Sequence, residues 1–201
     1  MTLERFYPIA DSSVWVARLV RAGARLVQLR VKDVDEAKVR VETRAAKAAC
    51  AAVGATLILN DFWRVALDEG VDFIHLGQGD LDCADITAIR AKGARIGLST
   101  HDDSELERAL SLAPHYVALG PIYPTRLKVM PFGPQGLDKI ALWKRRIGAV
   151  PLVAIGGLTP ARAKLCFAAG ANSCAVVTDI TLNADPEGRA REWVAATRMS
   201  A

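Results

Sequence analysis

The sequence predicts a (β/α)8 barrel, the TIM-barrel fold of the α/β class, built as one compact domain over residues 1–201. Short runs of apolar and β-branched residues alternate eight times with longer helical patterns. Most of these runs are apolar throughout, which is typical of strands covered on both faces. Eight units in 201 residues give about 25 residues per unit, near the lower end for this fold.

Each apolar run is interpreted as a strand, and each amphipathic stretch after it as a helix. The expected strands, in order, are Phe6–Ala10, Arg25–Arg30, Thr56–Asn60, Phe73–Leu76, Arg95–Leu98, Tyr116–Gly120, Leu152–Ile155 and Ser173–Val177. The expected helices, in order, are Ser13–Ala22, Asp35–Val53, Phe62–Glu69, Ala84–Ala91, Asp103–Leu112, Leu137–Arg146, Pro160–Ala169 and Pro186–Thr197.

Glycine marks six of the seven internal junctions between a helix and the next strand. A glycine there can adopt the left-handed conformation that ends a helix, and the seventh junction carries Pro114, which also stops one. Residues that favour helix starts add to the pattern. They are Asp35, Asp102 with Glu105 as a capping box, Thr159, Pro160 and Pro186.

An open, doubly wound sheet is the alternative fold. That fold binds its nucleotide through a glycine-rich turn after the first strand. Residues Asp11, Ser12 and Ser13 stand at that point instead, so the closed barrel is favoured.

Composition excludes several classes of protein. The 26 Lys and Arg against 22 Asp and Glu give a net charge of +4, too small to indicate nucleic-acid binding but compatible with small anions. No apolar run reaches the roughly 18 residues of a membrane helix, and the N-terminus lacks a signal-peptide pattern. We therefore expect a cytoplasmic protein that binds small molecules, with no nucleic acid and no membrane as partner. Whether it forms a homo-oligomer is left open.

The cysteines predict neither a zinc site nor a redox motif, because none forms a C-x-x-C pair. All of them lie in apolar stretches, so we expect buried, reduced thiols. They are Cys50, Cys83, Cys166 and Cys174.

Polar residues follow the second strand in strict alternation. Gln28, Arg30 and Lys32 share one face, and Leu29 and Val31 share the other. In a barrel the active site lies at the C-terminal ends of the strands, so the polar face points into the mouth. Unpaired buried cations are costly, which predicts an anionic ligand; a solvated strand end with Arg30 paired to an acid is the alternative.

Two carboxylates follow the third and fourth strands. Asp61 comes after Asn60, and Asp80 lies in the segment that begins with His75. Together they predict a Mg²⁺ site, since Mg²⁺ prefers one or two carboxylates, waters and phosphate oxygens. Taken singly, each aspartate is equally well interpreted as a helix cap, Asp82 included.

The fifth strand leads into Ser99 and His101. A hydrolase triad is disfavoured because adjacent side chains diverge and no nucleophile elbow is present. We expect Ser99 to contact substrate, and leave open whether His101 contributes. The other two histidines, His75 and His115, are expected to be satisfied core groups.

The last three strands offer a second place for an anion. A long loop, Pro121 to Gln135, carries Thr125 and Lys128 and is too long to be a simple connection. Gly156 and Gly157 follow the seventh strand, where backbone N–H groups often bind phosphate. Two anion sites, one of them metal-assisted, predict a transferase that joins a diphosphate substrate to a phosphorylated one.

These segments resemble the thiamine-phosphate synthase (thiamine phosphate pyrophosphorylase) family over nearly the whole chain. The matching segments are Gln28–Lys32, Leu57–Asp61, His75–Asp80, Gly97–His101, Gly120–Lys128 and Ala154–Leu158. The resemblance implies a transferase of thiamine biosynthesis, one that moves an alkyl or aryl group other than methyl. It would condense hydroxymethylpyrimidine diphosphate with thiazole phosphate, giving thiamine phosphate and pyrophosphate through Mg²⁺-assisted, dissociative loss of diphosphate.

The resemblance also assigns roles to residues. The catalytic residues it implies are Arg30, Lys32, Ser99 and Lys128, and the Mg²⁺ ligands are Asp61 and Asp80. Those implied for the pyrimidine diphosphate are Gln28, Leu29, Arg30, Val31, Lys32, Asn60, Ser99 and Lys128. Those implied for the thiazole phosphate are Thr125, Arg126, Leu127, Gly156, Gly157, Val177 and Thr178.

The chain departs from the family pattern near the second substrate. Leu127 stands where a threonine is usual, Thr178 where a serine is common, and Asp179 where a small apolar residue is common. An acid beside a phosphate is unfavourable, so Asp179 should point away or pair, with Arg126 as a candidate partner. Two other functions stay open: a thiazole tautomerase-like isomerase, and a non-catalytic sensor of phosphorylated ligands on the same barrel.

Overall fold

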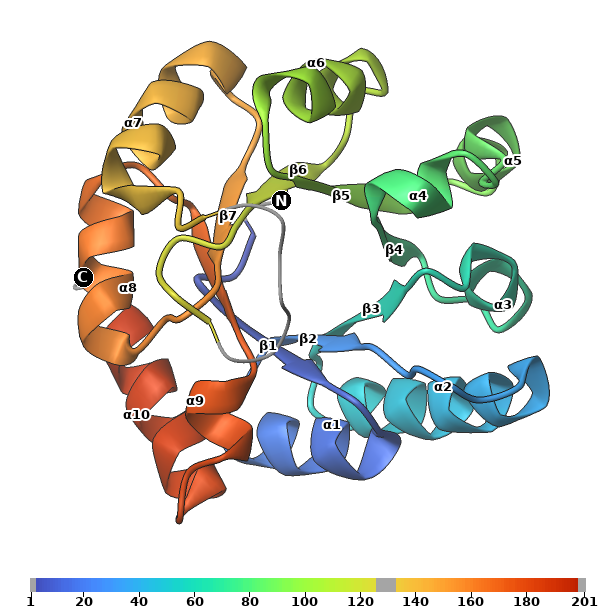
Figure 1. Cartoon of the computed structure of the whole chain (residues 1–201). Helices are drawn as coiled ribbons and strands as arrows, with labels where there is room; N and C mark the ends of the chain where they lie inside the picture. The colour runs from blue at the N-terminus through green and yellow to red at the C-terminus, as the bar shows by residue number, and fades with distance from the viewer. Residues whose placement is uncertain (1–2, 126–132, 199–201) are drawn as a thin grey trace.

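A computed structural model of the chain describes residues 3–125 and 133–198, and these residues form a closed, eight-stranded parallel barrel ringed by helices (Figure 1). The predicted (β/α)8 fold is confirmed. Each strand pairs with the next along the chain, and β8 pairs with β1 to close the ring. The strands are β1 (Phe6–Ala10), β2 (Leu26–Leu29), β3 (Thr56–Asn60), β4 (Phe73–Leu76), β5 (Arg95–Thr100), β6 (Tyr116–Leu119), β7 (Leu152–Ile155) and β8 (Ser173–Val176).

The helices agree with the predicted ones to within two residues at every end, and two short helices are additional. The helices are α1 (Ser13–Arg21), α2 (Glu36–Ala51), α3 (Trp63–Asp68), α4 (Gln78–Leu81), α5 (Ile86–Ala91), α6 (Asp103–Ser111), α7 (Gly136–Ile147), α8 (Pro160–Ala168), α9 (Thr178–Thr181) and α10 (Pro186–Thr197). The sequence predicted neither α4 nor α9, because four residues are too few to show a helical period.

Strand alternation divides the core into two layers. Side chains such as Tyr7, Ile58 and Val153 fill the interior of the barrel. A larger set, including Leu29, Leu59 and most helix-facing residues, fills the space between the sheet and the helices. Towards the C-terminal ends of the strands the inward face carries Gln28, Asn60, His75 and Ser99, and these polar residues place the candidate site.

The predicted boundaries are confirmed. All six junction glycines have a positive φ, and at the seventh junction Ala113 takes φ 38° just before Pro114. Asp35, Asp102 and Thr159 each accept a hydrogen bond from the first turn of their helix. The capping box at α6 is displaced by one residue, because Glu105 accepts from the backbone N–H of His101 at 2.7 Å.

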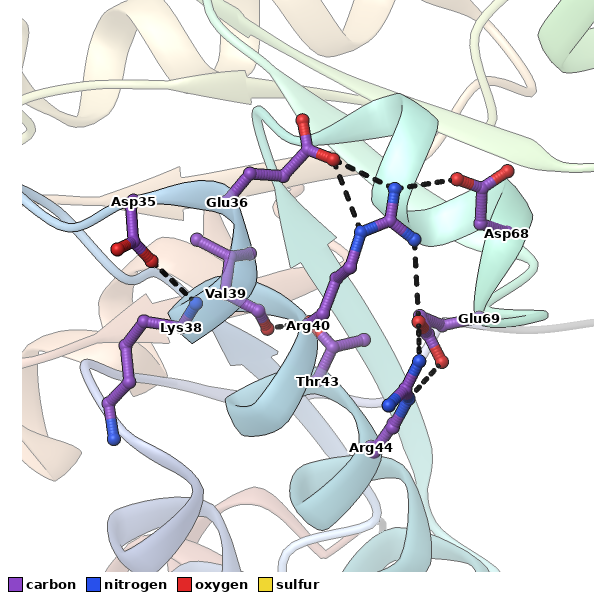
Figure 2. A network of polar contacts seen from close by, with 9 residues as sticks. All are labelled: Asp35, Glu36, Lys38, Val39, Arg40, Thr43, Arg44, Asp68 and Glu69. Atoms are coloured by element: carbon purple, nitrogen blue, oxygen red, sulfur yellow. Dashed lines mark hydrogen bonds and ion pairs between the residues drawn. The ribbon is translucent and has the colours of Figure 1, made fainter.

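A network of ion pairs joins α2 to α3 (Figure 2). Arg40 contacts Glu36 at 2.8 Å within α2 and Asp68 at 2.7 Å in α3. Glu69, which follows α3, binds Arg40 and also Arg44 at 2.7 Å. These helices follow β2 and β3, so the network holds together the two units that carry the cationic and the acidic residues of the candidate site.

The expectation for the cysteines needs one correction. Cys50, Cys166 and Cys174 are buried and free, but Cys83 is free and exposed. Cys83 lies in the connection between α4 and α5. Within the ranges that the structure describes, no helix is both long and apolar enough to cross a membrane.

Glu42 of α2 should stabilise the fold in a pH-dependent way. Its carboxylate accepts from the Ser13 N–H at 2.7 Å and pairs with Lys38 at 2.9 Å. The Ser13 hydroxyl and N–H, followed by Lys38, lower the pKa of Glu42 from 4.5 to about 2. A lowered pKa stabilises the folded state above its unfolded value, and this stabilisation is lost as the pH falls towards the folded value.

Glu42→Gln should therefore lower the free energy of unfolding by about 1–2 kcal/mol at pH 7. The loss should shrink as the pH falls from about 4.5 towards 2, in urea titrations at a series of pH values. Glu107→Gln, at a side chain 74% exposed, is the control and should change stability by less than about 0.5 kcal/mol. A loss for Glu42→Gln that is the same at every pH would contradict the charged role.

Candidate functional site

A column of hydrogen-bonded side chains crosses the inside of the barrel below its mouth. Gln28 Nε2 donates to Tyr7 Oη at 2.6 Å, and Tyr7 Oη lies 2.7 Å from Tyr116 Oη. Tyr116 Oη lies 2.7 Å from His75 Nδ1, and His75 Nε2 lies 2.8 Å from Ser99 Oγ. The column thus links β2, β1, β6, β4 and β5 and ends on a residue predicted to contact substrate.

The packing around Tyr116 explains why the column can form. A Cβ on Gly97 of β5 would lie 2.0 Å from the Tyr116 ring, so the ring occupies the space that a larger residue would fill. His75 pairs with Gly97 in the parallel register, and its ring stacks on Tyr116 with centroids 5.6 Å apart. Burial lowers the pKa of His75 to about 4, aided by the charge of Arg30 and opposed by Asp80, so the imidazole is neutral.

Side-chain contacts place two of the polar residues at the end of β2. Gln28 is buried inside the barrel, and Lys32 reaches Asp61 across the mouth as an ion pair. Arg30 and Lys32 border a cavity of about 580 Å³ at the ends of β1 and β2. The side chain of Leu29 lies in the outer layer, so of its groups only the backbone can face the mouth; Val31 belongs to the same layer and also borders the cavity.

Asp61 and Asp80 come together as predicted. The pKa of Asp80 is raised, first by burial and then by the hydrogen bond and negative charge of Asp61. Asp61 has φ 64°, which turns its side chain out of the strand path, and it caps no helix; α3 begins after Phe62 without a side-chain cap. Asp80 accepts from the Gly77 N–H at 3.0 Å in the first turn of α4.

This pair of carboxylates fits a divalent cation of the Mg²⁺ type. Asp61 lies close enough to Asp80 to raise the pKa of the Asp80 carboxyl group. Lys32 balances only one of the two negative charges. Within residues 3–125 and 133–198 no group of three or more His, Cys, Asp or Glu side chains could hold a metal. A site of two carboxylates is one that Mg²⁺ completes with waters and substrate phosphates, whereas zinc requires more protein ligands.

Within the part of the chain that the structure describes, three polar side-chain atoms at or beyond the strand ends are buried without a hydrogen-bond partner. They are Asn60 Nδ2, a donor, Gln78 Oε1, an acceptor, and Tyr123 Oη, which can be either. Gln78 is held in place because its Nε2 donates to the backbone oxygen of Ser99 at 2.7 Å. Buried unpaired groups are costly, which indicates that a ligand with both donors and acceptors completes this region.

The segments that follow β6 and β7 are packed so closely that no side chain fits at Gly156 or Gly157. A Cβ on Gly156 would lie 2.6 Å from Pro121 Cβ, and one on Gly157 would lie 2.4 Å from the Pro124 oxygen. Tyr123 N–H donates to the Gly156 oxygen at 3.1 Å. Thr125, which is partly buried, follows Pro124 in this segment. The predicted residues Arg126, Leu127 and Lys128 lie outside the described residues.

The end of β8 leads directly into α9. Val177 and Thr178 are partly buried where that short helix begins. Asp179 points to α10 instead of the mouth, because Arg189 binds both of its oxygens at 2.8 and 2.9 Å and Trp193 Nε1 donates to one of them at 2.7 Å. The predicted partner of Asp179 was Arg126; among the described residues it is Arg189.

The histidines differ from one another. His75 is a satisfied interior group, as expected. His115 is exposed, contrary to expectation, because it precedes β6 at the N-terminal end of the barrel. His101 bonds to Glu105 at 2.7 Å at the start of α6.

Sequence reasoning missed three residues of the site, which are Tyr7, Tyr116 and Gln78. A tyrosine inside an apolar run has the pattern of a core residue.

Paired carboxylates, cations and strand-end glycines at the C-terminal ends of the strands place the chain in the class of (β/α)8-barrel enzymes. A family model described as thiamine monophosphate synthase matches residues 6–180, and the chain belongs to that family. The predicted family and the predicted transferase class are confirmed.

Proteins with similar sequences or structures align with this chain over most of their length. The thiamine-phosphate synthase of Rhizobium etli is 61% identical over 197 residues, covering 98% of this chain and 97% of the relative. That of Escherichia coli is 46% identical over 179 residues, covering 89% and 85%. A thiamine phosphate pyrophosphorylase from Pyrococcus furiosus shares the fold, with a TM-score of 0.83 at 22% identity and coverage of 96% and 95%.

Gly157→Ala should destabilise the β6–β7 contact. The new methyl group would meet the Pro124 oxygen at 2.4 Å, at a residue with φ 64°. We expect a loss of about 2–4 kcal/mol in the free energy of unfolding, measured by urea denaturation. Gly54→Ala is the control, with φ 67° and no atom within 4 Å of the added Cβ, and should lose only about 1 kcal/mol. Equal losses would show that backbone conformation alone matters.

Proposed function

We propose that this chain condenses hydroxymethylpyrimidine diphosphate with thiazole phosphate, forming thiamine phosphate and pyrophosphate. The observation that carries the proposal is the joining of Lys32 to the Asp61 and Asp80 carboxylates at the mouth. Such a site suits a diphosphate that brings its own cation. The relatives named thiamine-phosphate synthase support the same reaction.

The pyrimidine diphosphate would occupy the half of the mouth formed by β2 to β5. The orphaned Asn60 donor and Gln78 acceptor suit a heteroaromatic ring that carries both kinds of group. The ring would lie above the polar column, with Ser99 in contact. Arg30, Lys32 and, from the sequence alone, Lys128 would bind the diphosphate.

Asp61 and Asp80 would hold Mg²⁺, which supplies a positive charge to the departing diphosphate. Lys32 would then exchange its bond to Asp61 for a phosphate oxygen. Arg30 and Lys32 stabilise the charge that develops as the C–O bond breaks, because the bonding electron pair leaves with the diphosphate. The thiazole nitrogen lone pair then forms the new C–N bond, so no proton is transferred and no general base is needed.

The thiazole phosphate would occupy the half formed by β6 to β8. The N–H groups near Gly156, Gly157 and Thr178, with the Val177 backbone, would bind its phosphate, and Thr125 would add a hydroxyl. The ion pair of Asp179 with Arg189 supports this assignment, because it holds a negative charge away from the proposed phosphate position. Arg126 and Leu127 are assigned from the sequence alone. The cytoplasmic location stays a prediction.

Pyrophosphate release separates this function from its alternatives. The purified chain should release pyrophosphate only when both substrates and Mg²⁺ are present, and EDTA should abolish the release. A phosphate sensor would release none, and a tautomerase-like isomerase would convert a thiazole without the diphosphate. Either result would contradict the proposed transferase.

Asp61→Asn should lower turnover about a hundredfold or more, because one charged metal ligand is lost. Asparagine tolerates the left-handed backbone found at Asp61, so the variant removes charge with little strain. Asp33→Asn is the matched control, because exposed Asp33 has φ 57° and the same charge. Turnover and Mg²⁺ dependence that are unchanged in Asp61→Asn would contradict the metal assignment.

A further inference from the structure

The buried column from Gln28 to Ser99 has few possible arrangements of protons, and this limits what Ser99 can offer a ligand. The hydroxyls of Tyr7 and Tyr116 each have one proton to donate, and a neutral imidazole has one N–H. The two tyrosines and Gln28 are at most 2% exposed, so water is not an alternative partner. Among the hydrogen bonds between described residues, those of the column are the only ones that use the two tyrosine oxygens.

Gln28 fixes one end of the column, since its amide nitrogen donates to Tyr7 Oη at 2.6 Å. Tyr7 must then place its own proton on Tyr116, because Gln28 offers it no acceptor. Tyr116 in turn donates to His75 Nδ1, which must be unprotonated. The remaining imidazole proton is therefore on Nε2 and is donated to Ser99 Oγ, 2.8 Å away.

If the hydrogen bonds of the column ran in the opposite direction, one proton would have no acceptor. If His75 Nδ1 carried the hydrogen, Tyr116 would accept it and donate to Tyr7, and the Tyr7 proton would face only donors. A buried, unsatisfied donor costs about 1–3 kcal/mol. That is roughly a fivefold to 150-fold preference for the first arrangement.

We infer that the column fixes His75 as the Nε2–H tautomer, so that Ser99 directs its hydroxyl proton into the barrel mouth and binds a hydrogen-bond acceptor on the substrate ring. Ser99 Oγ receives the His75 proton, which leaves its own O–H free to donate. Tyr7, Tyr116 and His75 are positioning residues that touch one another and Ser99 but not the substrate.

The inference specifies the substrate atom by its chemistry. A preoriented hydroxyl donor favours a ring nitrogen with a lone pair and disfavours a C–H at the same place. This part rests on the proposed function, in which the substrate ring is a pyrimidine with two such nitrogens. The tautomer of His75 is a property of the free protein and does not depend on the reaction.

The first test is ¹⁵N NMR of the free protein with labelled histidine. The sequence holds three histidines, and the variants His101→Gln and His115→Gln identify the signals of His75 by elimination, leaving the column intact. We expect a protonated Nε2 and an unprotonated Nδ1 at neutral pH. A protonated Nδ1 would overturn the inference, because it would mean that the Gln28 amide is reversed and Ser99 donates to His75.

The second test uses pyrimidine diphosphate analogues in which one ring nitrogen or the other is replaced by C–H. With the native protein, kcat/KM should fall at least about tenfold for one of the two analogues. Ser99→Ala should turn over the parent more slowly and should no longer distinguish that analogue from it. Equal kcat/KM for the parent and both analogues in the native protein would overturn the role of Ser99. A protein that turns over neither parent nor analogue, yet shows the Nε2–H tautomer, would refute the proposed function and leave the tautomer assignment standing.

Discussion

Closure of the barrel is the constraint on which the rest of the structure depends. Once β8 pairs with β1, every second side chain of each strand lies in one interior that bulk water does not reach. A polar atom there must bond to another side chain or be costly. The hydrogen-bonding groups of the column are paired with one another across strands that are far apart in sequence. The paired residues are Gln28, Tyr7, Tyr116 and His75, and each buried polar group depends on its neighbours for a partner.

The charges of the site are kept at the edge of this interior. Burial and then Asp61 raise the pKa of Asp80, and the charge of Lys32, which pairs with Asp61, opposes that rise. Asp179 is kept away from the mouth by Arg189 and Trp193 on α10. The mouth therefore has a cationic and acidic side at β2 to β4, and a side built mainly from backbone at β6 to β8.

Much of this arrangement could be predicted from the sequence because it follows from local periodicity. Alternation placed Gln28, Arg30 and Lys32 on one face, and glycines marked the ends of the units. Interactions between distant residues could not be predicted in the same way. Tyr7 and Tyr116 are 109 residues apart, and nothing in either apolar run shows that their hydroxyls meet. The partner of Asp179 was missed for a related reason, since a surface arginine on a helix has many acids within reach.

The helix α10 has a consequence for how the chain emerges from the ribosome. Its Trp193 ring stacks on Phe6 of β1, with centroids 5.7 Å apart, so the last helix covers the first strand. One strand neighbour of β1 is β8, which is also made late. During synthesis, β1 therefore lacks its pairing with β8, and the Phe6 ring lacks its cover, until residues 173–197 have been translated. Until those residues are available to cover it, β1 stays an unpaired edge.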